Sequence, residues 1–361
     1  MRNRLDRRTF LRRGVVGAGG VALLGPSLLA ACGGDDDTSS SGGGGGGSAD
    51  YGTLDYQLSW VKNVQFAGQY IADQEGYYTD VGFSGVNFIS GGPNVTQDAV
   101  VASGRAFLGI SAPDMTGSAV AEGAPLVIVA ALFQRNPFCV MSLPDSPITT
   151  LEDLEGKSIG VQAVNEPVWN AFLAANDIDP GSINQVPAQF DPQPLATGEV
   201  DGWFSFVTNE PNLLAVEGVE TEIMMLADFN YPLVSQVYVV RRDTIQNERE
   251  KLKAMLVADI RGWHDSLVDP ERGAALAANE YGADLGLDEE EQALESESQN
   301  ELIVSDDTRE NGILTMTDEL IEENIETLAI AGIELTADQL FDLSVINEVY
   351  EENPDLRELP V

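Results

Sequence analysis

The sequence has 361 residues, and its 59 acidic residues outnumber its 19 lysines and arginines, which gives a formal net charge of −40. This charge excludes the basic surface that nucleic acid or anionic lipid needs, so we expect no nucleic-acid partner. His264 is the only histidine and there are two cysteines, too few for a zinc site or for histidine-centred catalysis.

The N-terminal residues predict export and a lipid anchor. Residues 1–13 hold six arginines and one acid, and the run from Arg7 to Arg12 resembles the twin-arginine export signal. The uncharged stretch 14–31 is too short and too weakly apolar for a spanning helix and is typical of a removable signal peptide. The run from Leu29 to Cys32 resembles a bacterial lipoprotein cleavage site, with Cys32 as the lipidated residue. The alternative is an uncleaved anchor, which also puts the rest of the chain outside the cytoplasm.

We therefore expect residues 1–31 to be a twin-arginine lipoprotein signal peptide and residues 32–50 to be a tether at the outer face of the cytoplasmic membrane. Eight glycines, four serines and four aspartates follow Cys32, a composition typical of a flexible linker. Removing the signal peptide would leave 13 bases and 58 acids, a net charge of −45. Cys139 lies in an apolar run and is predicted to be a buried structural thiol.

Strand and helix patterns alternate in the first part of the remaining chain. Strands are predicted at 54–60, 86–89, 107–110, 126–133 and 158–161, with helices at 66–77, 94–102 and 112–122. This alternation predicts parallel βαβ units and an α/β fold. After Asp243 the patterns are helical only, at 250–268, 270–281, 288–303, 312–331 and 336–352. Residues 280–361 hold 25 acids and two bases, but their apolar stripe predicts packed helices with a charged, solvated outer face.

Several segments together resemble a known family over roughly residues 54–280. They are 58–72, 75–78, 91–93, 100–104, 151–161, 262–263 and 269–271. The chain is similar to ABC-transporter solute-binding proteins, in the subfamily for thiamine-pyrimidine precursors, riboflavin, nitrate and alkanesulfonates or taurine. The aromatic-rich opening and the Gly-Gly-Pro segment look most like the riboflavin and pyrimidine-precursor branch.

The resemblance implies an α/β fold of two lobes, the type II periplasmic-binding-protein fold, with the ligand cleft between the lobes and extra C-terminal helices. Residues 51–145 and 234–361 would form a discontinuous first lobe, and residues 146–233 the second lobe. The implied mechanism is hinge closure on a small-molecule ligand, after which ABC permease subunits recognise the closed form. We expect a monomer without a cofactor or metal.

Ligand-binding candidates follow the strands, because open α/β sheets bind ligands at the carboxyl ends of their strands. The candidates of the first lobe are Trp60, Asn63, Gln65, Phe66, Gly91, Gly92 and Ser111. An indole can stack on a flat heterocycle, amides can pair with its edge, and glycines allow close backbone approach. The alternatives are a core role for Trp60, a plain turn for the glycines and a helix cap for Ser111.

The second lobe supplies Asn165, Trp169, Phe206, Asn209, Glu210 and Tyr231 as candidates. In the pyrimidine-precursor branch, an aromatic residue followed four residues later by Glu contacts the ligand. Phe206 and Glu210 match that pattern, with Phe where Tyr is usual. The alternative for Glu210 is a favourable interaction with the helix macrodipole.

These residues predict a binding protein for a flat nitrogen heterocycle, either riboflavin or a thiamine pyrimidine precursor. The alternative ligand is an anion of the nitrate or sulfonate type, for which Lys62 and Arg135 would supply positive charge. A tethered sensor without transport is a second alternative. A pyrimidine-synthase-like enzyme is disfavoured, because the cysteine-rich iron motif of that enzyme is missing and His264 fits a satisfied histidine on a helix.

Overall fold

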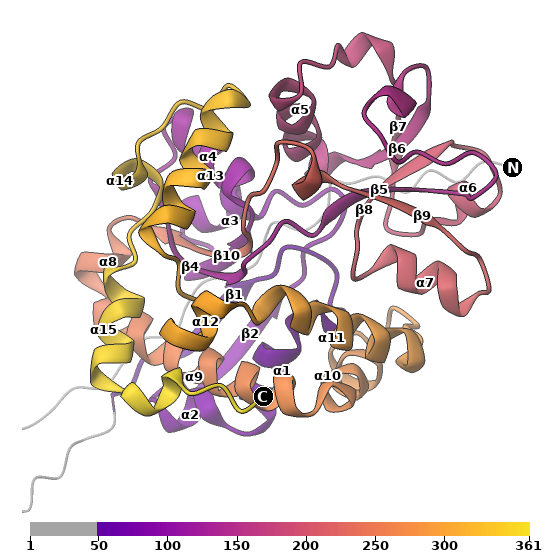
Figure 1. Ribbon diagram of the computed structural model, residues 1–361. Coiled ribbons are helices and arrows are strands. Elements are labelled where there is room, and N and C mark those ends of the chain that lie inside the picture. The colour runs from indigo at the N-terminus through magenta and orange to yellow at the C-terminus, as the bar shows by residue number, and fades with distance from the viewer. Residues whose placement is uncertain (1–48) are drawn as a thin grey trace, which may run out of the picture. The chain divides into compact units, whose positions relative to one another are not determined.

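The computed structural model describes residues 49–361. The predicted signal peptide, the predicted lipidation site Cys32 and nearly all of the predicted tether lie outside the described residues. Among residues 49–361, no helix combines the length and the apolarity that crossing a membrane requires. The described residues form two five-stranded sheets with helices packed around them (Figure 1).

The first sheet has the strand order β2-β1-β3-β10-β4. Its strands are β1 (Thr53–Gln57), β2 (Gly85–Ile89), β3 (Leu108–Ser111), β4 (Leu126–Phe133) and β10 (Ser235–Arg241). β1 pairs in parallel with β2 and β3, whereas β10 runs antiparallel to β3 and β4. Every residue of β4 is buried, as its unbroken apolar run predicts.

The second sheet has the strand order β7-β6-β8-β5-β9. Its strands are β5 (Phe138–Ser142), β6 (Ser158–Gln162), β7 (Asn184–Ala188), β8 (Gly202–Phe206) and β9 (Glu222–Met225). β6 is parallel to β7 and β8, while β5 is antiparallel to β8 and β9. The buried Cys139 lies on β5, which confirms the prediction of a structural thiol.

The pairing of β5 differs from the expected division at residue 145. Residues 138–142 belong to the second sheet, because β5 pairs there with β8 and β9. Four residues, 134–137, separate β4 from β5, and residues 226–234 separate β9 from β10. Because β4 and β5 are both apolar, the sequence pattern does not show that the chain passes from one sheet to the other between them. We propose that the first lobe comprises 51–133 and 235–361 and that the second lobe comprises 138–225.

The helices lie between the strands and after β10. Those before β10 are α1 (Ala67–Gln74), α2 (Tyr77–Asp80), α3 (Gln97–Ala102), α4 (Pro113–Ala121), α5 (Glu166–Ala175), α6 (Gln193–Ala196) and α7 (Glu210–Val216). Those after it are α8 (Thr244–Asn247), α9 (Arg249–Val268), α10 (Pro270–Leu276), α11 (Glu289–Ile303), α12 (Asp306–Asn311), α13 (Asp318–Ile330), α14 (Ala337–Leu340) and α15 (Ser344–Glu352). The expected helical C-terminal region is therefore present.

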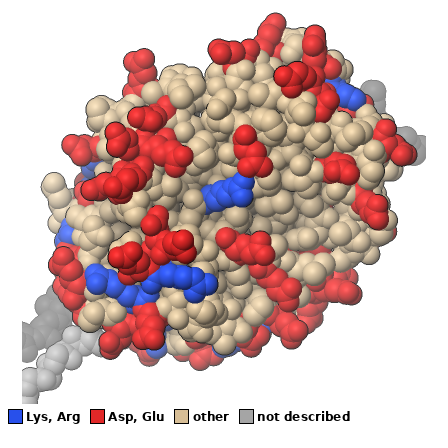
Figure 2. Space-filling model, in the orientation of Figure 1, with Lys and Arg blue, Asp and Glu red and all other residues tan. Residues whose placement is uncertain are grey.

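The predicted solvated acidic face is only partly correct. On the face drawn in Figure 2, acidic side chains are spread over the surface and basic ones form a few small groups. Glu291 and Glu295 of α11, however, are buried. Glu291 accepts a hydrogen bond from Gln292 of the same helix, and Glu295 accepts hydrogen bonds from Gln292 and from Asn63, which precedes α1. The sequence pattern missed both glutamates because amide partners leave no apolar spacing to detect.

A buried aspartate fastens α9 to the first sheet. Asp259 has no exposed surface, and it accepts hydrogen bonds from the Tyr56 hydroxyl at 2.8 Å and the Tyr78 hydroxyl at 2.5 Å. Burial raises the pKa of Asp259 to about 6, although these hydrogen bonds lower it. The network therefore depends on neutral donors and not on a cation.

We predict that Tyr78→Phe lowers the free energy of unfolding by about 1–3 kcal/mol, because it leaves a buried carboxylate oxygen without its donor. Tyr77→Phe is the matched control, since the Tyr77 hydroxyl also donates to an aspartate, Asp265, but at a partly exposed site. Tyr77→Phe should lower the free energy of unfolding by less than about 1 kcal/mol. Urea unfolding of both variants measures the difference, and equal costs would contradict the role of burial.

Candidate functional site

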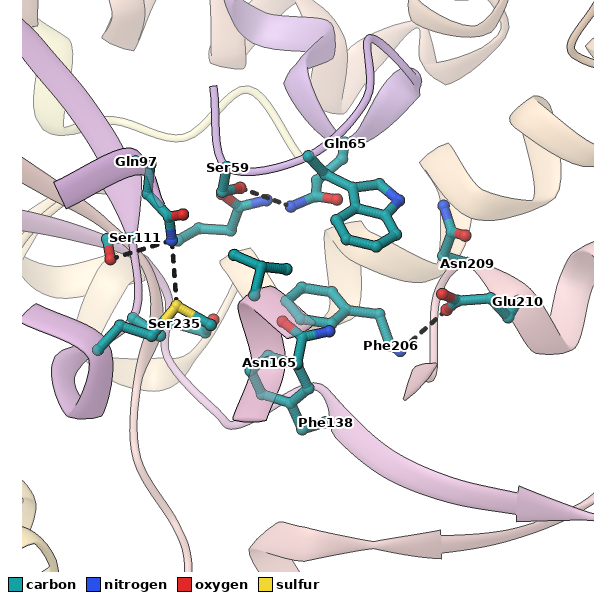
Figure 3. A pocket seen from close by; sticks show the side chains of 15 residues that line it. Ser59, Gln65, Gln97, Ser111, Phe138, Asn165, Phe206, Asn209, Glu210 and Ser235 are labelled. Carbon is teal, nitrogen blue, oxygen red and sulfur yellow. Dashed lines mark hydrogen bonds between the residues drawn. The ribbon is translucent and has the colours of Figure 1, made fainter. Parts of the chain in front are cut away.

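A cavity lies between residues of the two sheets (Figure 3). The first lobe supplies lining residues from the ends of β1 and β3, from α3 and α4 and from the start of β10. The second lobe supplies them from β5, from the end of β6, from β8 and from the start of α7. The cavity therefore lies where the lobes meet, at the strand ends where ligands bind in open α/β sheets.

Seven of the sequence candidates line this cavity. They are Trp60, Gln65, Ser111, Asn165, Phe206, Asn209 and Glu210. Four strands place them: β1 and β3 from the first sheet, β6 and β8 from the second. Trp60, Asn165, Asn209 and Glu210 lie within four residues after their strands, whereas Phe206 ends β8 and Ser111 ends β3. Gln65 lies farther along, in the short helical turn Val64–Phe66.

Four other candidates lie outside the cavity as buried side chains. Phe66 packs in one buried hydrophobic cluster, and Trp169 packs against Phe172 and Phe204 in another. The Tyr231 hydroxyl donates to Asp114 at 2.6 Å, and Asn63 donates to Glu295. Neighbouring protein groups contact these side chains, and none of the four lines the cavity.

The two glycine candidates, Gly91 and Gly92, do not line the cavity. The Gly91 N–H donates to the Trp60 carbonyl at 2.8 Å, and a Cβ on Gly91 would lie 2.5 Å from the Ser59 carbonyl carbon. The close approach is therefore to the loop that carries Trp60 and not to a ligand. Gly92 adopts a φ of +147°, which other residues rarely adopt.

Sequence reasoning missed eight lining residues: Ser59, Gln97, Ala112, Met115, Phe138, Val164, Ser235 and Gln236. Ser59, Ala112 and Val164 adjoin residues that were found, so the strand-end rule could have included them. Ser235 and Gln236 begin β10, and no local pattern places that strand between β3 and β4. Gln236 also adopts a φ of +51°, a left-handed conformation that few residues other than glycine adopt.

Aromatic side chains form one wall of the cavity. Trp60 comes from the first lobe, and Phe138 and Phe206 come from the second. The two phenylalanine rings meet edge to face, with their centroids 4.5 Å apart. A flat ring system between the indole and these phenyl rings would bury both of its faces.

Two polar atoms of the lining residues are buried without a partner among the described residues. They are the acceptor Gln97 Oε1 and the donor Gln236 Nε2. The amide nitrogen of Gln97 is held by Ser111 Oγ at 3.4 Å and by the Met115 sulfur at 3.0 Å (Figure 3). Ser111 in turn donates to the buried Asp98 at 2.7 Å. A buried polar atom without a partner is costly, so both atoms are suited to bind a ligand.

Glu210 begins α7 at the cavity wall. Its Oε2 accepts hydrogen bonds from Ser205 Oγ at 2.7 Å and from the Phe206 N–H at 3.0 Å. No hydrogen bond to its Oε1 is found among the described residues. Burial raises the pKa of Glu210 to about 7, although the Ser205 hydrogen bond lowers it. One carboxyl oxygen is therefore held by the protein and the other remains for a ligand.

The cavity lining carries no basic side chain among the described residues. Lys62 and Arg135 do not line it, and Arg135 instead pairs with Asp228 at 2.6 Å on the surface. Within residues 49–361, no cluster of His, Cys, Asp and Glu is arranged to hold a metal ion. The arrangement suits a neutral or weakly basic ring with several hydrogen-bonding edges, because a carboxyl group without a nearby cation repels an anion.

Two sheets joined by two crossings, with β10 inserted antiparallel next to β3 and a cavity between the lobes, define a type II periplasmic-binding-protein fold. The chain belongs to the NMT1/THI5-like family, which matches residues 63–273. The sequence resemblance to this family of solute-binding folds is thereby confirmed.

Curated relatives carry related names. The chain is 28% identical over 233 residues to the riboflavin-binding protein RibY of Chloroflexus aurantiacus, covering 61% of this chain and 64% of RibY. It is 22% identical over 244 residues to the formylaminopyrimidine-binding protein of Halalkalibacterium halodurans, covering 66% of this chain and 74% of that protein. The chain thus spans just under two thirds of the length of RibY.

Solved structures share the fold at low identity. The periplasmic aliphatic sulphonate binding protein SsuA of Escherichia coli has a TM-score of 0.57 at 17% identity, covering 85% of this chain and 89% of SsuA. The desulfurization enzyme DSZB has a TM-score of 0.53 at 15% identity, covering 83% of this chain and 99% of DSZB. The fold alone therefore does not separate a binding protein from an enzyme.

We predict that the free energy of unfolding falls as the pH rises from about 4.5 to 7. The folded chain holds the Glu210 proton up to a pKa of about 7, whereas the unfolded chain releases it near 4.5. The contribution of Glu210 is therefore fully present below pH 4.5 and is lost by about pH 7. In urea unfolding, Glu210→Gln should reduce the fall in the free energy of unfolding between pH 4.5 and 7 by about 2–3 kcal/mol. An unchanged slope would show that Glu210 is ionised throughout.

Proposed function

We propose that this chain is the extracytoplasmic solute-binding component of an ABC importer and that it captures a flat nitrogen heterocycle between its lobes. The observation that carries this proposal is the pair of unpartnered atoms, Gln97 Oε1 and Gln236 Nε2, in the cavity with the aromatic wall. A ring with both donor and acceptor edges would satisfy them together with Glu210. Riboflavin and the thiamine pyrimidine precursors have such edges.

The names of the relatives support the same ligand class. RibY is named for riboflavin and the Halalkalibacterium protein for formylaminopyrimidine. Binding of a nitrate- or sulfonate-type anion is the second candidate, and it is supported by the fold shared with SsuA. The lining favours the heterocycle, because it presents Glu210 and no lysine or arginine among the described residues.

The proposal includes an anchored location and a permease partner. Cys32 would carry the lipid, residues 32–50 would form the tether, and the monomeric binding unit would deliver ligand to ABC permease subunits at the membrane. The twin-arginine pattern and the cysteine after Leu29-Ala30-Ala31 support this proposal. A sensor that passes ligand to a receptor remains the alternative partner arrangement.

Catalysis is not part of the proposal. His264 lies on α9, does not line the cavity, and its Nε2 is buried without a partner, contrary to the expected satisfied histidine. Burial lowers the pKa of His264, so it remains neutral near pH 7. Binding alone accounts for the polar atoms of the cavity.

We predict that riboflavin or 4-amino-5-hydroxymethyl-2-methylpyrimidine raises the melting temperature of the purified chain by several degrees. Ligand that binds only the folded state stabilises it by about 2.7 kcal/mol at a hundred times Kd. Taurine and nitrate serve as the comparison ligands in the same thermal-shift measurement. Stabilisation by taurine or nitrate alone would overturn the heterocycle assignment.

We predict that Glu210→Gln weakens binding of the stabilising heterocycle by about 1–3 kcal/mol, because an amide replaces a carboxyl group that accepts ligand hydrogen bonds. Glu220→Gln removes the same charge at an exposed position beyond α7 and is the control. Isothermal titration calorimetry compares the two dissociation constants. If a folded Glu210→Gln protein binds as tightly as the control, Glu210 does not contact the ligand.

A further inference from the structure

Glu295 of α11 is wholly buried at the point where the two lobes meet. Its carboxylate oxygens accept hydrogen bonds from Asn63 Nδ2, at 3.0 and 3.2 Å, and from Asn209 Nδ2, at 3.0 Å each. Asn63 precedes α1 in the first lobe. Asn209 follows β8 in the second lobe and lines the cavity. A single carboxyl group therefore joins the two lobes at the cavity wall.

Helix α11 is fastened mainly to the first lobe. The Val64 N–H donates to Gln292 Oε1 at 2.7 Å, and Gln299 Nε2 donates to the Val64 carbonyl at 3.2 Å. On the side of the second lobe, the contact beside Asn209 is a hydrogen bond from Asn212 Nδ2 to Ser298 Oγ at 3.3 Å. When the lobes separate, α11 should stay with the first lobe and the Asn209–Glu295 contact should break.

The titratable groups that face Glu295 are acidic or phenolic. Glu291 lies one turn away on α11, Glu210 faces it from the second lobe, and Tyr70 faces it from α1. Asp288 lies beyond Glu291. No lysine, arginine or histidine forms an ion pair with these carboxyl groups among the described residues. The donors are the amides of Asn63, Asn209 and Gln292.

This arrangement favours a proton on the carboxyl groups when the lobes are closed. Burial, and then repulsion from Glu291, raise the pKa of Glu295 above its usual range. Burial also raises the pKa of Glu291 to about 7. A protonated Glu295 also has an acceptor at hand, because Asn63 Oδ1 is buried without a partner. Rotation of the Asn63 amide would turn that oxygen toward the carboxyl group.

We infer that Glu295 is a positioning residue of the ligand site: it holds the lobes closed through Asn63 and Asn209, and it takes up a proton as they close. The inference rests on the proposed function, since closure captures the ligand. Opening returns the carboxyl group to water, where its proton leaves more readily. Low pH therefore favours the closed form, and ligand that binds the closed form binds more weakly as the pH rises.

The test measures lobe closure without ligand. Thr79→Cys and Glu199→Cys place spin labels at exposed positions of the first and second lobes of the full-length chain. Cys32→Ser removes the cysteine outside the described residues, and the second native cysteine, Cys139, is buried. Pulsed electron paramagnetic resonance then gives the distance between the labels at pH 5.5 and 8.5. Glu297→Gln is the matched control, because Glu297 is an exposed glutamate of the same helix.

In the protein with Glu295 intact, the distance between the labels should be shorter at pH 5.5 than at pH 8.5. The Glu297→Gln control should show the same change in distance. Glu295→Gln mimics the protonated group, so the label distance in this variant should be short at both pH values. In Glu295→Ala the label distance should be long at both pH values. Circular dichroism confirms that each variant is folded. Distances that do not change with pH, or a control that responds like Glu295→Gln, would overturn the inference.

A second measurement separates this inference from the proposed function. The dissociation constant of riboflavin and of 4-amino-5-hydroxymethyl-2-methylpyrimidine should rise about tenfold from pH 6 to pH 8, and by less than about threefold in Glu295→Gln. If the distances respond to pH but neither probe binds, the heterocycle assignment fails and Glu295 keeps its role. If a probe binds equally at both pH values while the distances stay fixed, the role of Glu295 fails and the proposed function stands.

Discussion

The insertion of β10 between β3 and β4 is the constraint on which the rest of the structure depends. The first sheet is complete only when the chain returns from the second lobe and pairs antiparallel with both neighbours. The same return places Ser235 and Gln236 at the cavity and ties the lobes together through two short segments, 134–137 and 226–234. Two lobes joined in this way can open and close as bodies while the cavity between them stays assembled from both.

The small number of lysines and arginines affects the buried carboxyl groups as well as the surface charge. The chain holds 59 acids and 19 bases, and the buried carboxyl groups are held by hydroxyl and amide donors. Asp259 is held by tyrosines, Glu210 by Ser205 and Glu295 by asparagines. Without a cation these groups keep protons to higher pH, because burial penalises the charged form. Proton uptake is therefore linked to folding at Asp259 and Glu210, and in our proposal to lobe closure at Glu295.

The fold and half of the candidate site could be predicted from local patterns. Trp60 and Glu210 were found because each follows a strand, and strands of a parallel sheet end at one edge. Gln97 and Gln236 were not found, although they carry the unpartnered atoms of the cavity. Nothing near Gln236 in the sequence shows that its strand lies beside β3, because that pairing joins residues far apart in the chain.

The sequence by itself determined the alternation of strands and helices, the helical C-terminal region and the family, because hydrophobic periodicity and short motifs are local properties. Only the tertiary structure decided that β5 pairs in the second sheet, that Gly91 supports the loop of Trp60, and that Glu295 is buried between the lobes. Each of these depends on contacts between segments distant in the chain. The burial and the hydrogen-bond partners of a side chain follow from such contacts and not from its neighbours in sequence.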